Sequence, residues 1–300
     1  MIQPPYLMKG DKVGIVAPAR SITFEEVLPS MKLFQKWGLE VVLGTYIFSK
    51  EHQFAGADNQ RRADLQQMLD DPSIRAIICA RGGYGTVRII DRLDFTRFSG
   101  KPKWIAGYSD ITVLHSHVNQ QLGIETIHSV MPVNIKETDF ENDSVISLKK
   151  ALFGEKLFYS KPITFGLNTG LREGILIGGN LSILYSLMGS KSEPDTEGKI
   201  LFIEDVDEYL YHIDRMMMNL NRAGKLAKLN GLIVGGMDRM RDNEVPFGKT
   251  TREIISGVVE EFGYPVCFDF PAGHGELNLA LFLGRKIRMS IKHQDVEIEF

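Results

Sequence analysis

Three residues far apart in the sequence carry the side-chain types of a hydrolytic triad: Ser109, Glu204 and His274. Ser109 lies in the run GYSD at 107–110, between an apolar stretch typical of a strand and a pattern typical of a helix. A serine at such a corner stands out of the sheet, and the backbone N–H groups that follow it have no helical partner. The hydroxyl needs a neighbouring base. His274, in a glycine-flanked loop, and Glu204, at the end of an apolar run, are the candidates for that base and its partner.

The corner at Ser109 also fits a second interpretation. Serine is a common helix N-cap, and a purely structural cap explains the same four residues. The esterase form of the corner is Gly-x-Ser-x-Gly, whereas Ile111 stands here at the last glycine position. Cys79 is an alternative nucleophile, but it lies inside an apolar strand pattern, and reactive thiols need a polarising site. These residue types alone leave the choice between catalysis and capping open.

A glycine-rich loop, RGGYG at 81–85, follows the apolar run at 74–79. In a parallel sheet this loop opens at the same edge as the Ser109 corner, because both follow the carboxyl ends of strands. Glycine lets the backbone approach a ligand closely, so Gly83 can offer an N–H to an oxyanion. The planar guanidinium of Arg81 can bind a carboxylate, although a tight turn with a solvated arginine fits equally well. The glycine spacing does not match the Gly-x-Gly-x-x-Gly of a dinucleotide site.

Other polar motifs carry less chemical information. The glycine pair at 178–179 is expected to form a tight turn with a close backbone approach, with Gly179 and Asn180 shaping the cleft. The acidic run at 205–208 is expected at a solvated helix start, where the helix dipole favours negative charge. Attraction of a cationic substrate side chain is the alternative for that run. Neither His-Glu-x-x-His nor Cys-x-x-Cys occurs in the sequence, so no metal site is predicted.

Composition limits the class of protein. A chain of 300 residues is long enough for about two domains. The net charge of −3 gives no basic surface for nucleic acid, and no apolar run approaches the roughly 20 residues that cross a bilayer. Residues 1–7 lack the basic and apolar parts of a signal peptide, so we expect a cytoplasmic protein with no membrane partner. Cys79 and Cys267 are expected as buried, reduced thiols.

The hydrophobic patterns predict an α/β protein. In the first half, strands alternate with helices, which is typical of a parallel, doubly wound sheet covered on both faces. The strands are predicted at 13–17, 39–43, 74–79, before Ser109 and at 124–127, and the helices at 24–37, from an Asp58 cap onward, at 84–93 and at 110–122. In the second half, strands are predicted at 174–177, 200–204, 231–234 and 266–268, and helices at 181–188, 209–220 and 251–262. The tail at 281–300 has the pattern of two or three short strands.

These elements predict an N-terminal α/β domain at 1–135 that carries the nucleophile. A more polar segment at 136–169, with a short helix at 145–152, is predicted as a linker. The C-terminal α/β domain is predicted at 170–300, with a β-rich end, and it carries Glu204 and His274.

Taken in order, the motifs resemble the LD-carboxypeptidase family of serine peptidases over nearly the whole chain. The matching segments are 13–18, 81–85, 107–110, 178–182, Glu204 with 213–216, and 273–274. The resemblance implies a C-terminal domain of the swivelling type and a site between the two domains. It implies Ser109 as nucleophile, His274 and Glu204 as its partners, and an oxyanion hole formed by the backbone of Gly83 and Asp110.

The resemblance also implies a reaction and its setting. The enzyme would form an acyl-enzyme and release D-alanine from murein tetrapeptide, without a metal or other cofactor, during cell-wall recycling in the bacterial cytoplasm. The family leads us to expect a homodimer. We predict a substrate-binding set of Arg81, Gly82, Tyr84 and Asn180. One departure is Phe282, where many relatives carry proline, and it is expected to alter the loop after His274 while leaving the triad in place.

Two other functions remain as alternatives. A peptidase of the same fold could instead confer self-immunity by cleaving a peptide–nucleotide antibiotic, with aromatic side chains that stack on the base. A non-catalytic ligand-binding protein could also have two α/β lobes around a cleft, but it would not need the three triad residue types. A nicotinamide oxidoreductase is excluded because the chain has no phosphate-binding loop of the required spacing.

Overall fold

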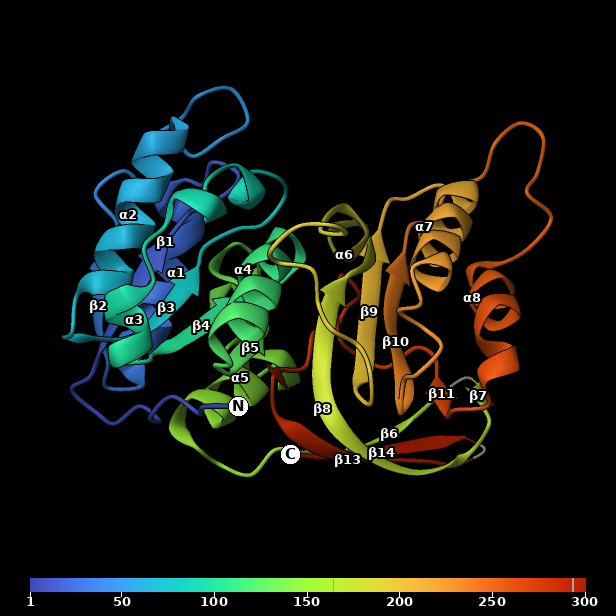
Figure 1. Cartoon of the computed structure of the whole chain (residues 1–300). Helices are drawn as coiled ribbons and strands as arrows, with labels where there is room; N and C mark the ends of the chain where they lie inside the picture. Colours follow the sequence, from blue (N-terminus) through green and yellow to red (C-terminus); the bar gives the residue numbers. More distant parts are fainter. Residues whose placement is uncertain (164, 293) are drawn as a thin grey trace.

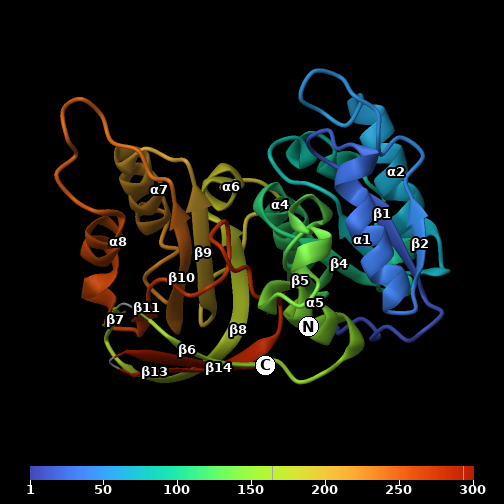
Figure 2. The ribbon, with the colours of Figure 1, turned by 180° about the vertical axis from the view of Figure 1, so that it is seen from behind.

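The computed structural model describes residues 1–163, 165–292 and 294–300, which form two β-sheets with helices packed against them (Figures 1 and 2). The first sheet has the strand order β12-β5-β4-β3-β1-β2. Strands β1 to β5 pair in parallel, and β12 adds an antiparallel edge. The strands of this sheet are β1 (Lys12–Val16), β2 (Glu40–Leu43), β3 (Ile74–Cys79), β4 (Trp104–Gly107), β5 (Thr126–His128) and β12 (Leu281–Leu283).

Helices cover both faces of this sheet, as the alternating pattern predicts. The longer helices are α1 (Phe24–Lys36), α2 (Asp58–Asp70), α3 (Thr96–Gly100), α4 (Thr112–His117) and α5 (Asp143–Phe153). Side chains of α1 and α5 share one apolar core with the sheet, whereas those of α2, α3 and α4 lie in the core on the opposite face. Short helical turns complete this half: η1 (Thr86–Arg88), η2 (Ile90–Arg92), η3 (Ser109–Ile111), η4 (Val118–Leu122), η5 (Pro132–Asn134) and η6 (Glu137–Asp139).

Two local predictions for this half are wrong. Asp58 does not cap α2: the cap position is Ala57, and Asp58 is the first helical residue, with its carboxylate bonded to Arg61 and Arg88. Residues 84–93 do not form one helix but the two separate turns η1 and η2. The backbone N–H of Thr86, at the start of η1, is bonded to a buried carboxylate on the next loop.

The second sheet has the order β6-β14-β13-β8-β9-β10-β11-β7. Its centre, β8 to β11, is parallel, and antiparallel strands extend it on both sides. The strands are β6 (Phe158–Pro162), β7 (Gly166–Leu167), β8 (Gly170–Asn180), β9 (Ile200–Val206), β10 (Gly231–Asp238), β11 (Val266–Cys267), β13 (Lys286–Ile291) and β14 (Asp295–Glu299). The helices that pack on it are α6 (Leu181–Ser186), α7 (Leu210–Arg222) and α8 (Thr251–Val259), followed by η7 (Glu260–Phe262). The β-rich tail is confirmed.

The two halves are closely joined. The segment 136–169, predicted as a linker, holds η6, α5, β6 and β7, and its residue Thr164 lies outside the described residues. Strand β12 comes from the C-terminal part of the chain but pairs with β5 of the first sheet. One apolar core extends from α1 to β13 and β14. The division at 135 and 170 stays a prediction.

The glycine pair 178–179 lies inside β8, not in a turn, and it lets the two halves approach each other. Both residues have positive φ, at 126° and 138°. A Cβ on Gly178 would overlap the carbonyl of Phe202 on β9, and one on Gly179 would overlap the side chain of Thr112 on α4. Backbone without side chains is therefore required where β8 meets its neighbours. Among the described residues, no helix is both long and apolar enough to cross a membrane.

Candidate active site

Ser109 lies two residues after the end of β4, at the start of the short turn η3, and its backbone is strained. Its φ is +63°, in the left-handed region that non-glycine residues seldom adopt. The loop after β3 packs against it, because a Cβ added to Gly82 would lie 2.9 Å from Ser109 Cβ and 3.0 Å from its Oγ. The strained corner and the close glycine together hold the hydroxyl at the mouth of a cleft.

His274, which is partly buried and lines the same cleft, forms a pair with the fully buried Glu204. Nδ1 of His274 donates to Glu204 Oε2 at 2.6 Å, which leaves Nε2 of the ring as the acceptor. Glu204 lies on β9 with its side chain fully buried. The histidine loop can approach it because Gly273 has φ +113°, and a Cβ there would lie 2.8 Å from the carboxylate. Burial lowers the pKa of His274, but its bond to Glu204 and the carboxylate charge outweigh burial and raise it above the ordinary 6.5.

Two side chains from the first sheet fix the histidine loop in place. Tyr108, next to Ser109, packs its ring against His274 with centroids 4.8 Å apart. His128, at the end of β5, donates from Nε2 to Asn278 Oδ1 at 2.9 Å. The same Oδ1 accepts the N–H of Gly273, also at 2.9 Å. Burial lowers the pKa of His128 to about 3, so the ring is neutral and serves as a fixed donor.

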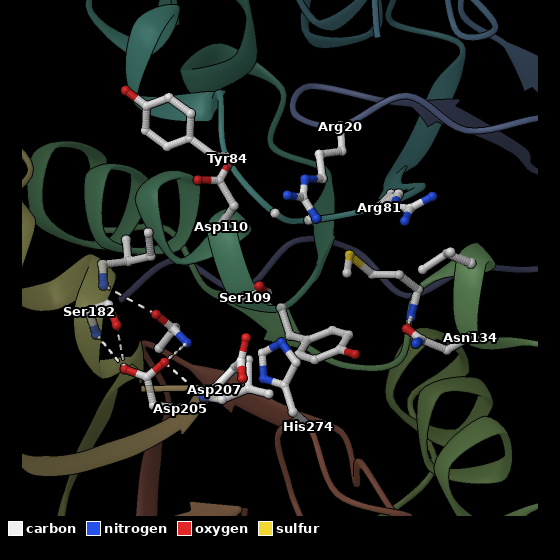
Figure 3. Close-up of a pocket in the computed structure, with 18 of the residues that line it drawn as sticks. Arg20, Arg81, Tyr84, Ser109, Asp110, Asn134, Ser182, Asp205, Asp207 and His274 are labelled. Carbon is white, nitrogen blue, oxygen red and sulfur yellow. Dashed lines mark hydrogen bonds between the residues drawn. The ribbon is translucent and has the colours of Figure 1, made fainter. Parts of the chain in front are cut away.

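Ser109 and His274 therefore line the same cleft, on loops from the two halves of the chain (Figure 3). Within the described ranges, no hydrogen bond joins the hydroxyl of Ser109 to His274. Catalytic bonds are often long in free enzymes and tighten in the substrate complex. The arrangement places a hydroxyl, an imidazole and a carboxylate in the order that nucleophilic catalysis uses.

Two backbone N–H groups predicted for an oxyanion hole flank Ser109. Gly83 has φ +103° and belongs to the loop that packs on the corner. Asp110 follows Ser109, and its buried carboxylate accepts the N–H of Thr86 at 2.8 Å. Burial raises the pKa of Asp110, while its bonds to Thr86 oppose that effect. The carboxylate thus fastens the corner to the glycine loop and fixes the two N–H groups relative to each other.

The cleft has a volume of about 570 Å³ and is lined from both halves of the chain. Arg81, Gly82, Tyr84 and Asn180, the substrate-binding residues predicted from the sequence, all lie on its wall. The side chain of Asn180 is engaged within the protein, since it donates to Asp205 and accepts the N–H of Ile183 at the start of α6.

The cleft also contains groups that the sequence analysis missed. Arg20 and Arg239 line it, from the loop after β1 and the end of β10. Arg20 follows the first strand at the same sheet edge as the glycine loop, so strand order alone could have indicated it. His128 and Asn278 gave no such signal, because their contact joins positions 150 residues apart.

The acidic run is not a solvated helix start. Asp205 is the sixth residue of β9 and is buried, with bonds from Asn180, Ser182 and the N–H of Val206. Burial raises its pKa to about 6, helped by the charge of Glu204 and opposed by those bonds. Asp207 and Glu208 do line the cleft, but they pair with Arg241 and His212. The run therefore divides into one buried structural carboxylate and two paired ones.

The remaining alternatives for catalysis lack support in the site. Cys79 is a free, fully buried thiol, and burial raises its pKa far above neutrality, which disfavours the reactive thiolate. Cys267 is also free and buried, as expected. In the part of the chain that the structure describes, no group of three or more His, Cys, Asp or Glu side chains is arranged to hold a metal ion.

Comparison with known proteins gives the class of this one. The N-terminal domain of the LD-carboxypeptidase family matches residues 13–129, and its C-terminal domain matches residues 173–289. "Probable murein peptide carboxypeptidase" of Bacillus subtilis is 36% identical over 99% of this chain and 94% of its own length. "Murein tetrapeptide carboxypeptidase" of Pseudomonas aeruginosa is 27% identical over 91% of each chain. These matches identify a serine-type carboxypeptidase, which is a hydrolase. The chain belongs to the LD-carboxypeptidase family.

Solved structures support the same fold. The muramoyltetrapeptide carboxypeptidase from Oxalobacter formigenes superposes with a TM-score of 0.87 at 24% identity, covering 96% of this chain and 98% of that one. MccF in complex with glutamyl sulfamoyl guanosine superposes with a TM-score of 0.89 at 20% identity, covering 99% and 98%. At these identities the likeness establishes the fold alone.

Proposed function

We propose that this enzyme hydrolyses the bond between an L-centre and a terminal D-alanine in murein tetrapeptide, with Ser109, His274 and Glu204 as the catalytic triad. The observation that carries the proposal is the pair of opposed walls in one cleft: a strained serine on one side and, on the other, an imidazole held at 2.6 Å by a buried carboxylate. The substrate is proposed from the two relatives whose names specify murein peptides.

The chemical steps follow from the positions of these groups. Nε2 of His274 takes the proton of Ser109 as Oγ attacks the scissile carbonyl carbon. The N–H groups of Gly83 and Asp110 bind the resulting oxyanion, and loss of one such donor typically costs about 100- to 1000-fold in rate. His274 then returns the proton to the leaving nitrogen, the C–N bond breaks, and D-alanine departs from an acyl-enzyme.

The second half of the cycle uses the same residues. Water gives a proton to Nε2 of His274 and attacks the ester carbon, and the proton then returns to Ser109 as the ester bond breaks. Glu204 keeps Nδ1 protonated and stabilises the imidazolium in both halves. The buried position of Glu204 strengthens this interaction, because water does not compete for the carboxylate. No step draws on a cofactor.

Mass spectrometry of murein tetrapeptide incubated with the parent protein and with Ser109→Ala tests the proposal. The parent is expected to produce tripeptide and D-alanine, while the variant leaves the tetrapeptide intact. An aspartyl-sulfamoyl adenylate serves as the second substrate. Faster cleavage of that conjugate than of tetrapeptide would favour the immunity peptidase, and retained peptide affinity without any product in both proteins would favour a ligand-binding protein.

We also propose a cytoplasmic homodimer, on the basis of the family resemblance. Sedimentation of the purified protein tests the dimer, since a monomer mass at micromolar concentration would contradict it.

A further inference from the structure

A carboxypeptidase of the proposed specificity acts one residue away from a free carboxylate. In a bound peptide, three covalent bonds separate the scissile carbon from that carboxylate carbon, a distance under about 4 Å. A cation that recognises the terminus must therefore lie beside the oxyanion position. Among the described residues, three arginines line the cleft: Arg20, Arg81 and Arg239.

Two of these arginines already have carboxylate partners. Nη1 of Arg81 lies 3.3 Å from Glu26 Oε1 and also donates to the carbonyl of Ser21. Figure 3 shows its guanidinium turned away from Ser109. Nε of Arg239 lies 3.1 Å from Asp238 Oδ2, its neighbour in sequence. Arg81 therefore joins the glycine loop to α1, and Arg239, whose side chain is largely exposed, pairs with the neighbouring Asp238.

Arg20 has a different environment. The backbone N–H of Arg20 donates to the carbonyl of Gly82 at 3.3 Å. Its side chain packs along Gly83, and a Cβ added to Gly83 would lie 3.0 Å from Nε of Arg20. Its guanidinium donates to the neutral amide oxygen of Gln53 at 3.5 Å, and no carboxylate lies within ion-pair distance of it among the described residues. In Figure 3 the guanidinium extends into the cleft above Ser109.

We infer that Arg20 binds the α-carboxylate of the leaving amino acid and makes the enzyme select peptides with a free C-terminus. The inference rests on the proposed function. The planar guanidinium can form two parallel bonds to a carboxylate, which are stronger than its single long bond to Gln53. Because the same side chain packs on Gly83, the carboxylate and the oxyanion are bound by neighbouring groups on two adjacent loops, those after β1 and β3.

Two tetrapeptides that differ only at the C-terminus, one a free acid and one a carboxamide, test this role. The parent is expected to prefer the acid in kcat/KM by roughly 10- to 150-fold, the range of a hydrogen bond to a charged group. Arg20→Gln is expected to abolish the preference, because kcat/KM for the free-acid peptide falls while kcat/KM for the carboxamide peptide is unchanged. Arg20→Lys is expected to keep part of the preference. Arg288→Gln, on β13 and outside the cleft, is the matched control and should keep the full preference.

Three results would overturn the inference: a parent without the preference, equal losses on acid and amide in Arg20→Gln, or loss of the preference in Arg81→Gln alone. Thermal unfolding of each variant separates a folding defect from a change in selectivity. The preference is also measured as the ratio of the Kd values of the carboxamide and free-acid peptides, using Ser109→Ala protein, which is expected to bind them without turnover. A parent that cleaves neither peptide contradicts the proposed function, while the Kd ratio still decides whether Arg20 reads the carboxylate.

Discussion

Replacing Glu204 by glutamine is expected to shift the acid limb of the pH–rate profile and to slow the reaction. Burial lowers the pKa of His274, whereas the bond to Glu204 and its charge raise it above 6.5. The glutamine side chain removes the negative charge at position 204, whereas His274 stays as buried as before. The pKa of His274 in Glu204→Gln is therefore expected to fall below 6.5.

The size of the rate loss follows from the same contact. Glu204 Oε2 lies 2.6 Å from Nδ1 of His274, and its side chain is fully buried, so the bond is charge-assisted and screened from water. A hydrogen bond to a charged group contributes about 1.5–3 kcal/mol, which corresponds to roughly 10- to 150-fold in rate. An amide can also donate. Where its NH₂ group faces Nδ1 it fixes the wrong tautomer, and the loss grows toward ~10⁴-fold.

The assay is kcat/KM for D-alanine release, followed from about pH 5 to pH 9. Because the neutral imidazole is the active base, the rate falls as pH drops through the pKa of His274. The midpoint of that fall is expected above pH 6.5 in the parent and below pH 6.5 in Glu204→Gln.

Glu125→Gln is the control for loss of a buried carboxylate. Glu125 accepts from Arg285 Nε at 2.9 Å and lies outside the cleft, so its replacement should keep the parent midpoint. An acid midpoint in Glu204→Gln equal to that of the parent, or an undiminished plateau rate, would refute the role assigned to Glu204.

Three further substitutions probe the supports of the site. Gly82→Ala brings a Cβ to 2.9 Å from Ser109 Cβ. This overpacking should lower the free energy of unfolding by about 1–3 kcal/mol. Because the added methyl group displaces the Ser109 hydroxyl, kcat should fall by ~10²-fold. Asn278→Ala removes the acceptor of the Gly273 N–H, so kcat should fall by roughly tenfold, the value of one hydrogen bond. Phe282→Ala removes a fully buried ring and should cost about 3–5 kcal/mol in urea unfolding.

Each of these substitutions has a matched control or a contradicting result. Gly257→Ala, at an exposed position of α8 with no atom within 4 Å of the added Cβ, should stabilise the protein by up to about 1 kcal/mol. Asn278→Asp retains the acceptor oxygen and should retain more activity than Asn278→Ala. Full activity in Gly82→Ala, equal kcat in the two Asn278 variants, or an unchanged unfolding midpoint in Phe282→Ala would contradict the corresponding packing argument.

Phe282 forms a core contact between the two halves of the chain. Its ring packs against Trp104 and Phe300 with centroids 5.4 Å and 5.6 Å away, and the guanidinium of Arg285 lies 3.5 Å above it. Within β12 it stands opposite Ile127 of the first sheet. The residue therefore joins the C-terminal segment to the N-terminal sheet through a core contact, at a distance from the cleft.

Much of the fold followed from local patterns. Helix α1 (Phe24–Lys36) closely matches the predicted helix at 24–37, and the structure adds a capping box of Thr23 and Glu26 at its start. Strand β3 occupies the whole predicted run 74–79, since a short, nearly continuous apolar run is typical of a strand in a parallel sheet covered on both faces. The segment 84–93 differs from its prediction, since it forms the two short turns η1 and η2 instead of one helix.

The sequence by itself determined the chemical types available: a serine at a strand-to-helix corner, a carboxylate ending a strand, and a histidine between glycines. Those features are local, since they depend on hydrophobic periodicity and on the conformations that glycine permits. Only the tertiary structure decided which of these groups meet. It buried Asp205, turned Arg81 toward Glu26 and left Arg20 facing the cleft, because burial and ion pairing depend on neighbours that lie far away along the chain.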